Sequence, residues 1–448
     1  MQTVYLRGNV TTNMKLSGFF YKVIIIAFLT VSPVLSRGQY LMDMIDTTTE
    51  VGKGLLYIFK DFNQIRIGSY MQPQYQVASS KGINSYSGGD FGLQVNNRFM
   101  FRRARIRFDY MRYTEAEQPS IHIVFQVDGT ERGVVIRDVW GRFFDNRWNL
   151  FSATTGMFAR PFGFEVNLSS SNRETPERGR MSQILMKTER DLGAMVSLEP
   201  RIKNHPLRFL KFDVGIFNGQ GMAAPAEFDS YKDIISRVAL KPYPITQNIQ
   251  LSAGASYLNG GIYQATKYIN QLGSGNNKNI YITDSSENNI GGKAPRIYHG
   301  VDAQIKLKSN LGDTEIRGEY WWGMQPSTAN DPETPASLIT DPLYIRNFDG
   351  AFFYLLQRLG IKHQLGVKFD WYDPNTIISE EQIGMASSRT NFGDIQFSTV
   401  SIGYNHYFNK NVKLFLWYDI VKNEKTSLTG YEDDIDDNVF TCRLQFEF

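Results

Sequence analysis

Arginine recurs at every second position in one stretch of this 448-residue chain. Arg103, Arg105 and Arg107 alternate with apolar residues, so in an extended strand their side chains share one face at a spacing of about 7 Å. Arginine stays charged at any physiological pH, and its planar fork matches the oxygens of a carboxylate or phosphate. Such a column could pass an anion from one weak site to the next. Arg102 falls on the apolar face, where we expect it to snorkel or to lie near a membrane interface.

The three arginines have an alternative role as structural braces. Asp109, Asp128 and Asp138 lie on the same or the following predicted strands and could pair with them. Such pairs would hold a wall together and leave only a mild charge preference. The sequence leaves bracing and a dedicated anion path equally open.

The elements that carry these residues alternate with period two. In the last strand, Phe440, Cys442, Leu444, Phe446 and Phe448 share one face and polar residues share the other. Lipid on one side and an aqueous lumen on the other demand this pattern. The sequence therefore predicts an all-β fold, a transmembrane antiparallel β-barrel of about 16 strands. We expect strands near residues 63–77, 96–113, 119–129, 133–147, 150–160, 190–199, 206–218, 232–242, 247–259, 296–308, 312–325, 347–359, 361–374, 395–409, 411–422 and 437–448.

The connections between these strands differ in length. Tight Asn- and Gly-rich turns at 145–149, 309–313, 359–360 and 408–411 are typical of hairpins and should face the periplasm. Long polar stretches at 261–295, 326–346, 374–393 and 422–437 should form extracellular loops. A soluble all-β protein would not separate its loops by length so regularly.

The third long-side connection, residues 161–189, is strongly charged. It carries the cations Arg173, Arg178, Arg180 and Lys187, together with four glutamates. We expect this loop to fold into the pore, where its charges would meet the arginine column and set a filter. A solvated surface loop is the alternative.

The N-terminus reads as a secretory signal. Lys15 and Lys22 precede an apolar run at 23–35, and small residues follow, with cleavage expected after Gly38. We divide the chain into an N-terminal extension plus signal peptide (1–38), a periplasmic segment (39–62) and the barrel (63–448). The outer membrane of a Gram-negative bacterium is the expected location. An N-terminal membrane anchor is the alternative, although Pro33 interrupts a run shorter than the about 20 residues that an anchor needs.

Composition narrows the possible functions. Mean hydropathy is −0.33, too polar for a helical membrane protein, and aromatic residues make up 14%. The net charge of +3 leaves any charge preference to local placement. The five histidines are scattered singly, and no nucleophile–base pair, metal-spaced cluster or phosphate-cradling glycine loop appears. We therefore expect neither an enzyme nor a cofactor, and no nucleic-acid partner, because the other face of the basic strand is apolar.

Three segments resemble the family of phosphate-selective porins O and P. They are residues 102–107, Arg137-Asp138-Val139-Trp140, and residues 155–165, which hold a Gly-x-Phe-x-x-Pro-Phe-Gly-x-Glu pattern. The resemblance implies an anion-preferring, trimeric, sixteen-stranded porin whose third loop narrows the channel, with phosphate as a candidate solute. The chain also ends on Phe448, as do outer-membrane proteins that present their last strand to the barrel-assembly machinery. Membrane lipid is the remaining expected partner.

Two other functions stay open. A general porin would need no phosphate specificity, and an adhesin would use the long loops at 261–295, 326–346 and 422–437 to bind a surface. Conductance separates a porin from a surface-binding barrel with a blocked pore.

Overall fold

Antiparallel strands account for most of the chain that the structure describes. The structure, a computed structural model, describes residues 64–448 except 223, 225 and 274–278. The predicted signal sequence (1–38) and periplasmic segment (39–62) lie outside these residues. Among the described residues, no helix is both long enough and apolar enough to cross a lipid bilayer.

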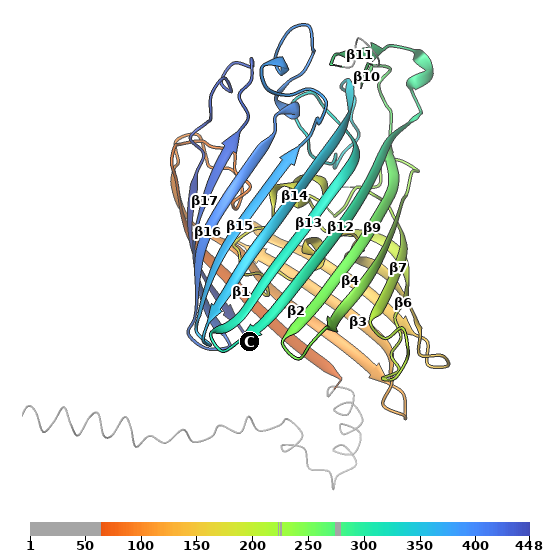
Figure 1. Ribbon diagram of the computed structural model, residues 1–448. Coiled ribbons are helices and arrows are strands. Elements are labelled where there is room, and N and C mark those ends of the chain that lie inside the picture. The colour runs from red at the N-terminus through yellow and green to blue at the C-terminus, as the bar shows by residue number, and fades with distance from the viewer. Residues whose placement is uncertain (1–63, 223, 225, 274–278) are drawn as a thin grey trace, which may run out of the picture. The chain divides into compact units, whose positions relative to one another are not determined.

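Sixteen strands form a closed antiparallel barrel, as the sequence predicts (Figure 1). Each strand falls on a predicted stretch, and the ends differ by a few residues. The strands of the wall are β1 (Ile65–Ala78), β2 (Asn97–Tyr113), β3 (Pro119–Thr130), β4 (Gly133–Phe144), β5 (Phe151–Ala159), β6 (Arg190–Leu198), β7 (Leu210–Phe217), β8 (Asp233–Pro244), β9 (Ile249–Tyr263), β12 (Lys293–Ser309), β13 (Gly312–Ser327), β14 (Leu343–Leu359), β15 (His363–Asp373), β16 (Phe397–Tyr407), β17 (Val412–Asn423) and β18 (Val439–Glu447).

The first and last strands pair with each other and close the barrel. β18 runs antiparallel to β1, with Tyr70 opposite Glu447. The backbone N–H of Ser69 donates to the carbonyl of Phe448 at 3.3 Å, and the reciprocal bond measures 3.0 Å. Closure pairs the two strands that would otherwise be edges, which a hydrocarbon environment requires.

The two faces of the strands separate as predicted. In β18, Thr441, Arg443 and Gln445 are buried inside the barrel, whereas Phe440 and Leu444 are exposed on the outside. Because every second residue meets lipid, the apolar alternation in the sequence is enough to place most side chains.

The connections differ in length between the two ends of the barrel (Figure 1). At one end, which also holds the C-terminus, strands are joined by turns such as 310–311 and 360–362. At the other end lie the connections 79–96, 160–189, 218–232, 264–292, 328–342, 374–396 and 424–438. The one exception at this end is the two-residue connection 131–132.

The long loops contain more order than the sequence analysis predicted. Within 264–292, β10 (Ile269–Leu272) pairs with β11 (Tyr281–Asp284), and β10 runs parallel to the first residues of β14. Strands this short carry too few alternating residues to be seen in a sequence. Beneath them, Arg346 binds Asp394 at 2.9 Å with both side chains fully buried, so this half of the loop end is a packed structure.

Candidate functional site

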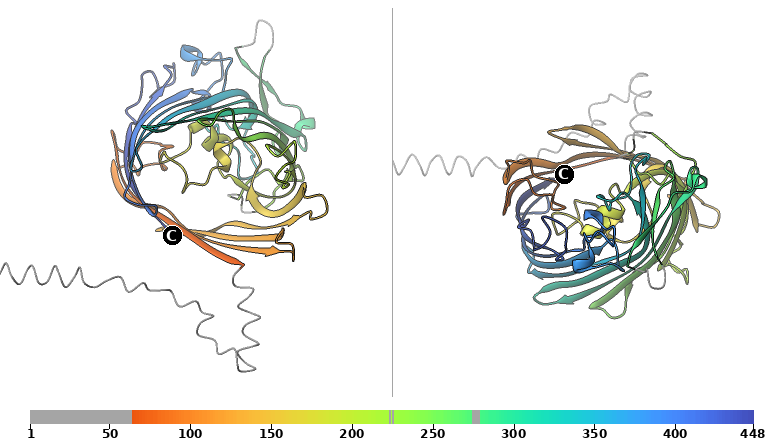
Figure 2. Two further views of the ribbon diagram at one scale, coloured as in Figure 1. Left: turned by 60° about the horizontal axis from the view of Figure 1, so that its bottom comes forward. Right: turned by 90° about the horizontal axis from the view of Figure 1, so that it is seen from above.

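The third loop, residues 160–189, lies inside the ring of strands, as predicted (Figure 2, yellow). It contains the 3-10 turn η2 (Glu165–Asn167) and the short helix α3 (Arg180–Leu185). Its backbone bonds to strands around the barrel: Gly163 donates to Ser256 of β9 at 3.0 Å, and the carbonyl of Glu174 accepts from Asn405 of β16 at 2.7 Å. The loop therefore fills part of the lumen from wall to wall.

The motif that precedes the loop supplies its anchor. Gly163 has a φ of +65°, and a Cβ at this position would lie 1.9 Å from Oε1 of Glu319. The Glu319 carboxylate accepts the backbone N–H groups of Phe164 and Glu165, each at 3.0 Å. Phe162 is fully buried, with its ring centroid 4.7 Å from that of Trp321. The Pro-Phe-Gly-x-Glu pattern thus begins a loop whose first turn is locked against β13.

Glu165 then ties the loop to itself. Its carboxylate accepts the N–H of Gly179 at 3.0 Å, the hydroxyl of Ser182 at 2.5 Å and the hydroxyl of Tyr354 at 2.5 Å. These bonds hold the start of the loop, the start of α3 and strand β14 together. The last residue of the motif therefore has a structural role.

A β-bulge in β2 turns two consecutive arginines into the lumen. Ala104 pairs with Met71 but Phe101 pairs with Pro73, so Arg102 and Arg103 together face Gln72. Two residues opposite one is the geometry of a bulge. The prediction that Arg102 lies on the apolar face is wrong, because strict alternation stops at this position.

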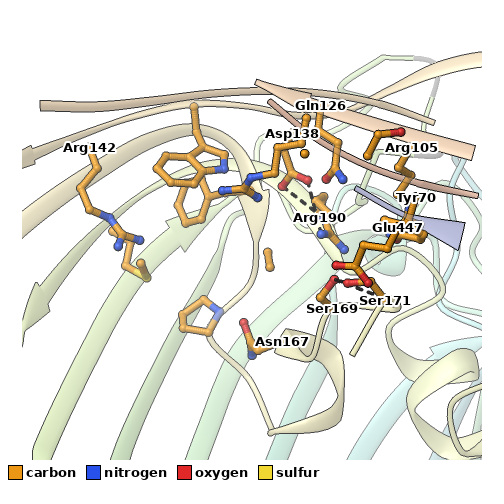
Figure 3. Close-up of a pocket in the computed structure, with 18 of the residues that line it drawn as sticks. Tyr70, Arg105, Gln126, Asp138, Arg142, Asn167, Ser169, Ser171, Arg190 and Glu447 are labelled. Carbon is orange, nitrogen blue, oxygen red and sulfur yellow. Dashed lines mark hydrogen bonds and ion pairs between the residues drawn. The ribbon is translucent and has the colours of Figure 1, made fainter. Parts of the chain in front are cut away.

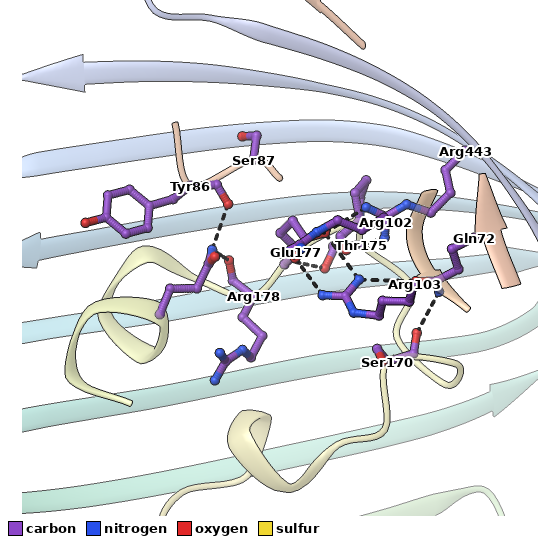
Figure 4. A network of polar contacts seen from close by, with 12 residues as sticks. Gln72, Tyr86, Ser87, Arg102, Arg103, Ser170, Thr175, Glu177, Arg178 and Arg443 are labelled. Atoms are coloured by element: carbon purple, nitrogen blue, oxygen red, sulfur yellow. Dashed lines mark hydrogen bonds and ion pairs between the residues drawn. The ribbon is translucent and has the colours of Figure 1, made fainter. Parts of the chain in front are cut away.

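Three arginines converge on Glu177 of the third loop (Figure 4). Arg102 and Arg103 bind its carboxylate at 2.8 Å, and Arg443 of β18 binds it at 2.7 Å. Burial alone would raise the pKa of Glu177, but the three positive charges hold it well below its ordinary value. One negative charge is therefore shared among three positive ones.

A second cluster with the same composition surrounds Glu189. Arg137 binds it at 2.5 Å, Arg178 at 3.5 Å and Arg190 at 3.6 Å. Arg137 also owes its position to a bulge, because Gln126 pairs with Asp138 while Val127 pairs with Ile136. Burial opposes ionisation of Glu189, yet the surrounding arginines hold its pKa well below its ordinary value. Both bulges thus add one arginine that binds a glutamate of the third loop.

Two cavities lie beside the third loop. The upper cavity, toward the long loops, has a volume of about 800 Å³, and its lining includes Arg103, Arg178, Arg180 and Lys187. The lower cavity, with a volume of about 360 Å³, is lined by Arg107 and Arg190 among others (Figure 3). Arg105 lines both. A solute that passes along β2 would meet the upper cavity, then Arg105, then the lower cavity.

Each of the three predicted wall arginines has a carboxylate partner. Arg103 pairs with Glu177 as described, Arg105 binds Asp128 at 2.7 Å, and Arg107 binds Asp109 at 2.7 Å. Arg105 also donates to the hydroxyl of Ser170 at 2.8 Å. The bracing contacts considered in the sequence analysis are therefore present, and the same side chains line the cavities.

The predicted loop cations have different surroundings. Arg173 is buried, lines neither cavity, and its Nε and Nη1 have no hydrogen-bond partner among the described residues. Burial, reinforced by Arg103 and Arg178, lowers the pKa of Arg173 to about 10, so it stays charged at neutral pH. Arg180 lies 4.7 Å from the ring centroid of Tyr86 and 4.1 Å from that of Phe397. Lys187 forms an ion pair with Glu333.

Four further arginines near the path were not among the predicted site residues: Arg137, Arg142, Arg190 and Arg443. Arg142 lines the lower cavity two residues after Trp140, and Arg443 alternates with apolar residues in β18. Alternation alone could have marked Arg142 and Arg443 as facing the lumen. Arg137 is placed by the bulge described above, and Arg190 shares the parity of the outward-facing Leu192 and Val196. The carboxylate partners of Arg137 and Arg443 could not be identified, because they lie 52 and 266 residues away in the sequence.

These features define a class of protein by its fold, a sixteen-stranded β-barrel of the porin type with an inward-folded third loop and arginine-lined cavities beside it. The family described as phosphate-selective porin O and P matches residues 368–448, from within β15 to the C-terminus, which confirms the resemblance. The match lies outside the three segments, within 98–190, on which the resemblance rested.

Solved porins share the fold. OprB of Pseudomonas putida has a TM-score of 0.55 at 9% identity, over 90% of this chain and 97% of that chain. The channel DcaP of Acinetobacter baumannii has a TM-score of 0.52 at 13% identity, with 86% and 97% covered. An anion-selective porin from Comamonas acidovorans has a TM-score of 0.51 at 10% identity, with 86% and 99% covered. At these identities the likeness establishes the fold alone. No curated protein sequence matches the chain.

Proposed function

We propose that this protein is a porin that passes small solutes by diffusion and favours anions. The observation that carries the proposal is the charge balance where the third loop meets β18, β2, β3, β4 and β6. There, among the described residues, seven arginines form ion pairs with four carboxylates, an excess of three positive charges. The arginines are Arg102, Arg103, Arg105, Arg137, Arg178, Arg190 and Arg443, and the carboxylates are Asp128, Asp138, Glu177 and Glu189.

An excess of arginine over carboxylate leaves donors for a passing anion. Arg137, which lines the upper cavity, uses only Nη2 on Glu189. The bound glutamates limit how tightly an anion can bind, because they compete for the same guanidinium groups. Weak binding at successive positions is what conduction requires. We propose Arg103, Arg105, Arg107, Arg178, Arg180 and Lys187 as residues of this path, with Arg173 supporting it from behind.

Reversal potential in a planar bilayer tests the proposal. Under a KCl gradient we expect an anion-selective current, and added phosphate should reduce it if the arginine clusters bind phosphate. Cation selectivity or no preference would contradict the anion path. Anion selectivity without a phosphate effect would leave a general porin, which the pairing of Arg105 with Asp128 and of Arg107 with Asp109 makes the second candidate.

The cellular setting follows from the same architecture. We propose that the protein resides in a Gram-negative outer membrane with the long loops outside the cell, and that it acts as a channel rather than an enzyme.

We further propose a homotrimer. An apolar depression of about 770 Å³ on the outer wall, floored by small residues such as Gly141, Ala153 and Ala194, offers a surface for a second copy. Light scattering of the detergent-solubilised protein measures its oligomeric state.

Anion preference should increase at mildly acidic pH. Asp437, in the connection 424–438, lines the upper cavity beside Arg180. Burial outweighs the effect of Arg180 and raises the pKa of Asp437 to about 6. As the pH falls from 7.5 to 5, this carboxylate takes up a proton and the cavity gains one positive charge. We expect the permeability ratio of chloride to potassium to rise about twofold.

The Asp437→Asn variant provides the matched control. It removes the charge at every pH, so its selectivity should already be higher at pH 7.5 and should change little at pH 5. If the permeability ratio of this variant still rises between pH 7.5 and 5 as much as in the wild type, a group other than Asp437 causes the effect.

A further inference from the structure

The lower cavity combines cations with a lumen-facing tryptophan. The ring of Trp140 lies 5.2 Å from the guanidinium carbon of Arg142 and 5.9 Å from that of Arg107. All three residues line the cavity. The imidazole of His122 packs against the indole, with the ring centroids 4.9 Å apart in a T-shaped arrangement. The indole therefore lies close to two positive charges.

Arg142 differs from the other cations of this cavity. Arg105, Arg107, Arg190 and Lys211 each form an ion pair with an aspartate. Arg142 pairs with no carboxylate among the described residues, and its Nε donates to the hydroxyl of Thr154 at 2.8 Å. This bond fixes the guanidinium plane and leaves Nη1 and Nη2 without a protein acceptor in the described structure. That edge has the geometry to bind one carboxylate through two parallel hydrogen bonds.

Part of the remaining lining is apolar and suited to an organic solute. Tyr70, Phe158, Pro161 and Met195 also border the cavity. Its volume of about 360 Å³ is many times what a single water molecule needs, so an inorganic anion would fill only a small part. Apolar side chains thus cover part of the wall, and charged and polar side chains such as Arg107, Arg142 and Asp213 cover the rest. An aromatic ring and a carboxylate could each meet a suitable part of such a mixed lining.

We propose that the lower cavity is a binding site for organic anions that carry an aromatic ring. The ring packs beside Trp140 and the apolar wall, and the carboxylate binds Nη1 and Nη2 of Arg142. The site lies on the path proposed above and deepens that function by naming a class of solute. It distinguishes an aromatic carboxylate from a small anion of equal charge, because only the former contacts the indole.

Block of the channel by matched anions tests this site. Benzoate and acetate each carry one carboxylate, so their half-blocking concentrations compare the effect of the ring. In the wild-type channel we expect benzoate to block at a concentration about fivefold lower than acetate. In Trp140→Leu the half-blocking concentrations of benzoate and acetate should lie within about twofold of each other. In Trp140→Phe most of the fivefold difference should remain, because phenylalanine keeps an aromatic ring. Trp148→Leu, in the turn between β4 and β5 and outside the cavity, is the matched control and should behave as wild type.

Arg142→Gln separates the two parts of the site. It should weaken block by benzoate and acetate alike and leave their ratio near fivefold. Equal block by both anions in the wild-type channel would overturn the proposed site while the KCl selectivity still supported an anion-favouring porin.

Calorimetric titration of the purified protein with benzoate is independent of conductance. Binding that Trp140→Leu abolishes would support the site even in a channel without anion preference. Binding that is absent, or unchanged in that variant, would reject it.

Discussion

Replacing Gly163 with alanine is expected to raise the single-channel conductance about twofold or more, because the third loop will no longer hold its place in the lumen. The added Cβ would lie 1.9 Å from Oε1 of Glu319 and 2.8 Å from the ring of Trp321. Glu319 must then move away from the N–H groups of Phe164 and Glu165, and leaving such groups unpaired costs about 1–3 kcal/mol each. A sixteen-stranded barrel without its inward loop is wide and filled with water.

Gly360→Ala is the matched control for this substitution. Gly360 has a φ of +64°, almost the same as the +65° of Gly163, but no atom lies within 4 Å of the point that an added Cβ would occupy there. Both variants therefore carry the same backbone strain, and only one carries the collision. Conductance in planar bilayers should change for Gly163→Ala alone. Equal conductance in the two variants would show that the anchor at Glu319 does not hold the loop.

Reversing the charges of Arg105 and Arg107 together is expected to convert the channel from anion to cation preference. The double substitution to glutamate changes the local charge by four units beside Asp128 and Asp109. Arg105 lines both cavities and Arg107 lines the lower one. Local fields of this kind change ion concentrations in a narrow passage by a factor on the order of ten or more. We expect the permeability ratio to change on that scale, as measured by reversal potential.

The charge change needs a control away from the path. Lys203 and Arg208 lie exposed in the turn between β6 and β7, and their double substitution to glutamate alters the charge by the same amount. Selectivity should stay near wild type there. If the selectivity is unchanged when Arg105 and Arg107 are both glutamate, these two arginines only brace the wall. The charge preference would then come from the arginine clusters around Glu177 and Glu189.

The bulge in β2 could have been detected in the sequence. Phe99 and Phe101 are apolar at odd positions, whereas Ile106 and Phe108 are apolar at even positions. An outer face that changes parity requires one extra residue between them. The prediction assumed strict alternation along the whole of β2, and for this reason it placed Arg102 on the apolar face.

The sequence by itself determined the sixteen strands, the two faces of the wall, the separation of turns from loops and the closing strand. These features are local, because lipid and water impose a period of two on every strand independently of its neighbours. Only the tertiary structure decided which charges meet. Glu177 binds Arg443, which lies 266 residues further along the chain, and the depth to which the third loop enters is set by Ser256, Glu319 and Tyr354 on distant strands. Such contacts depend on barrel closure and on the register of all the strands between them, which no local pattern encodes.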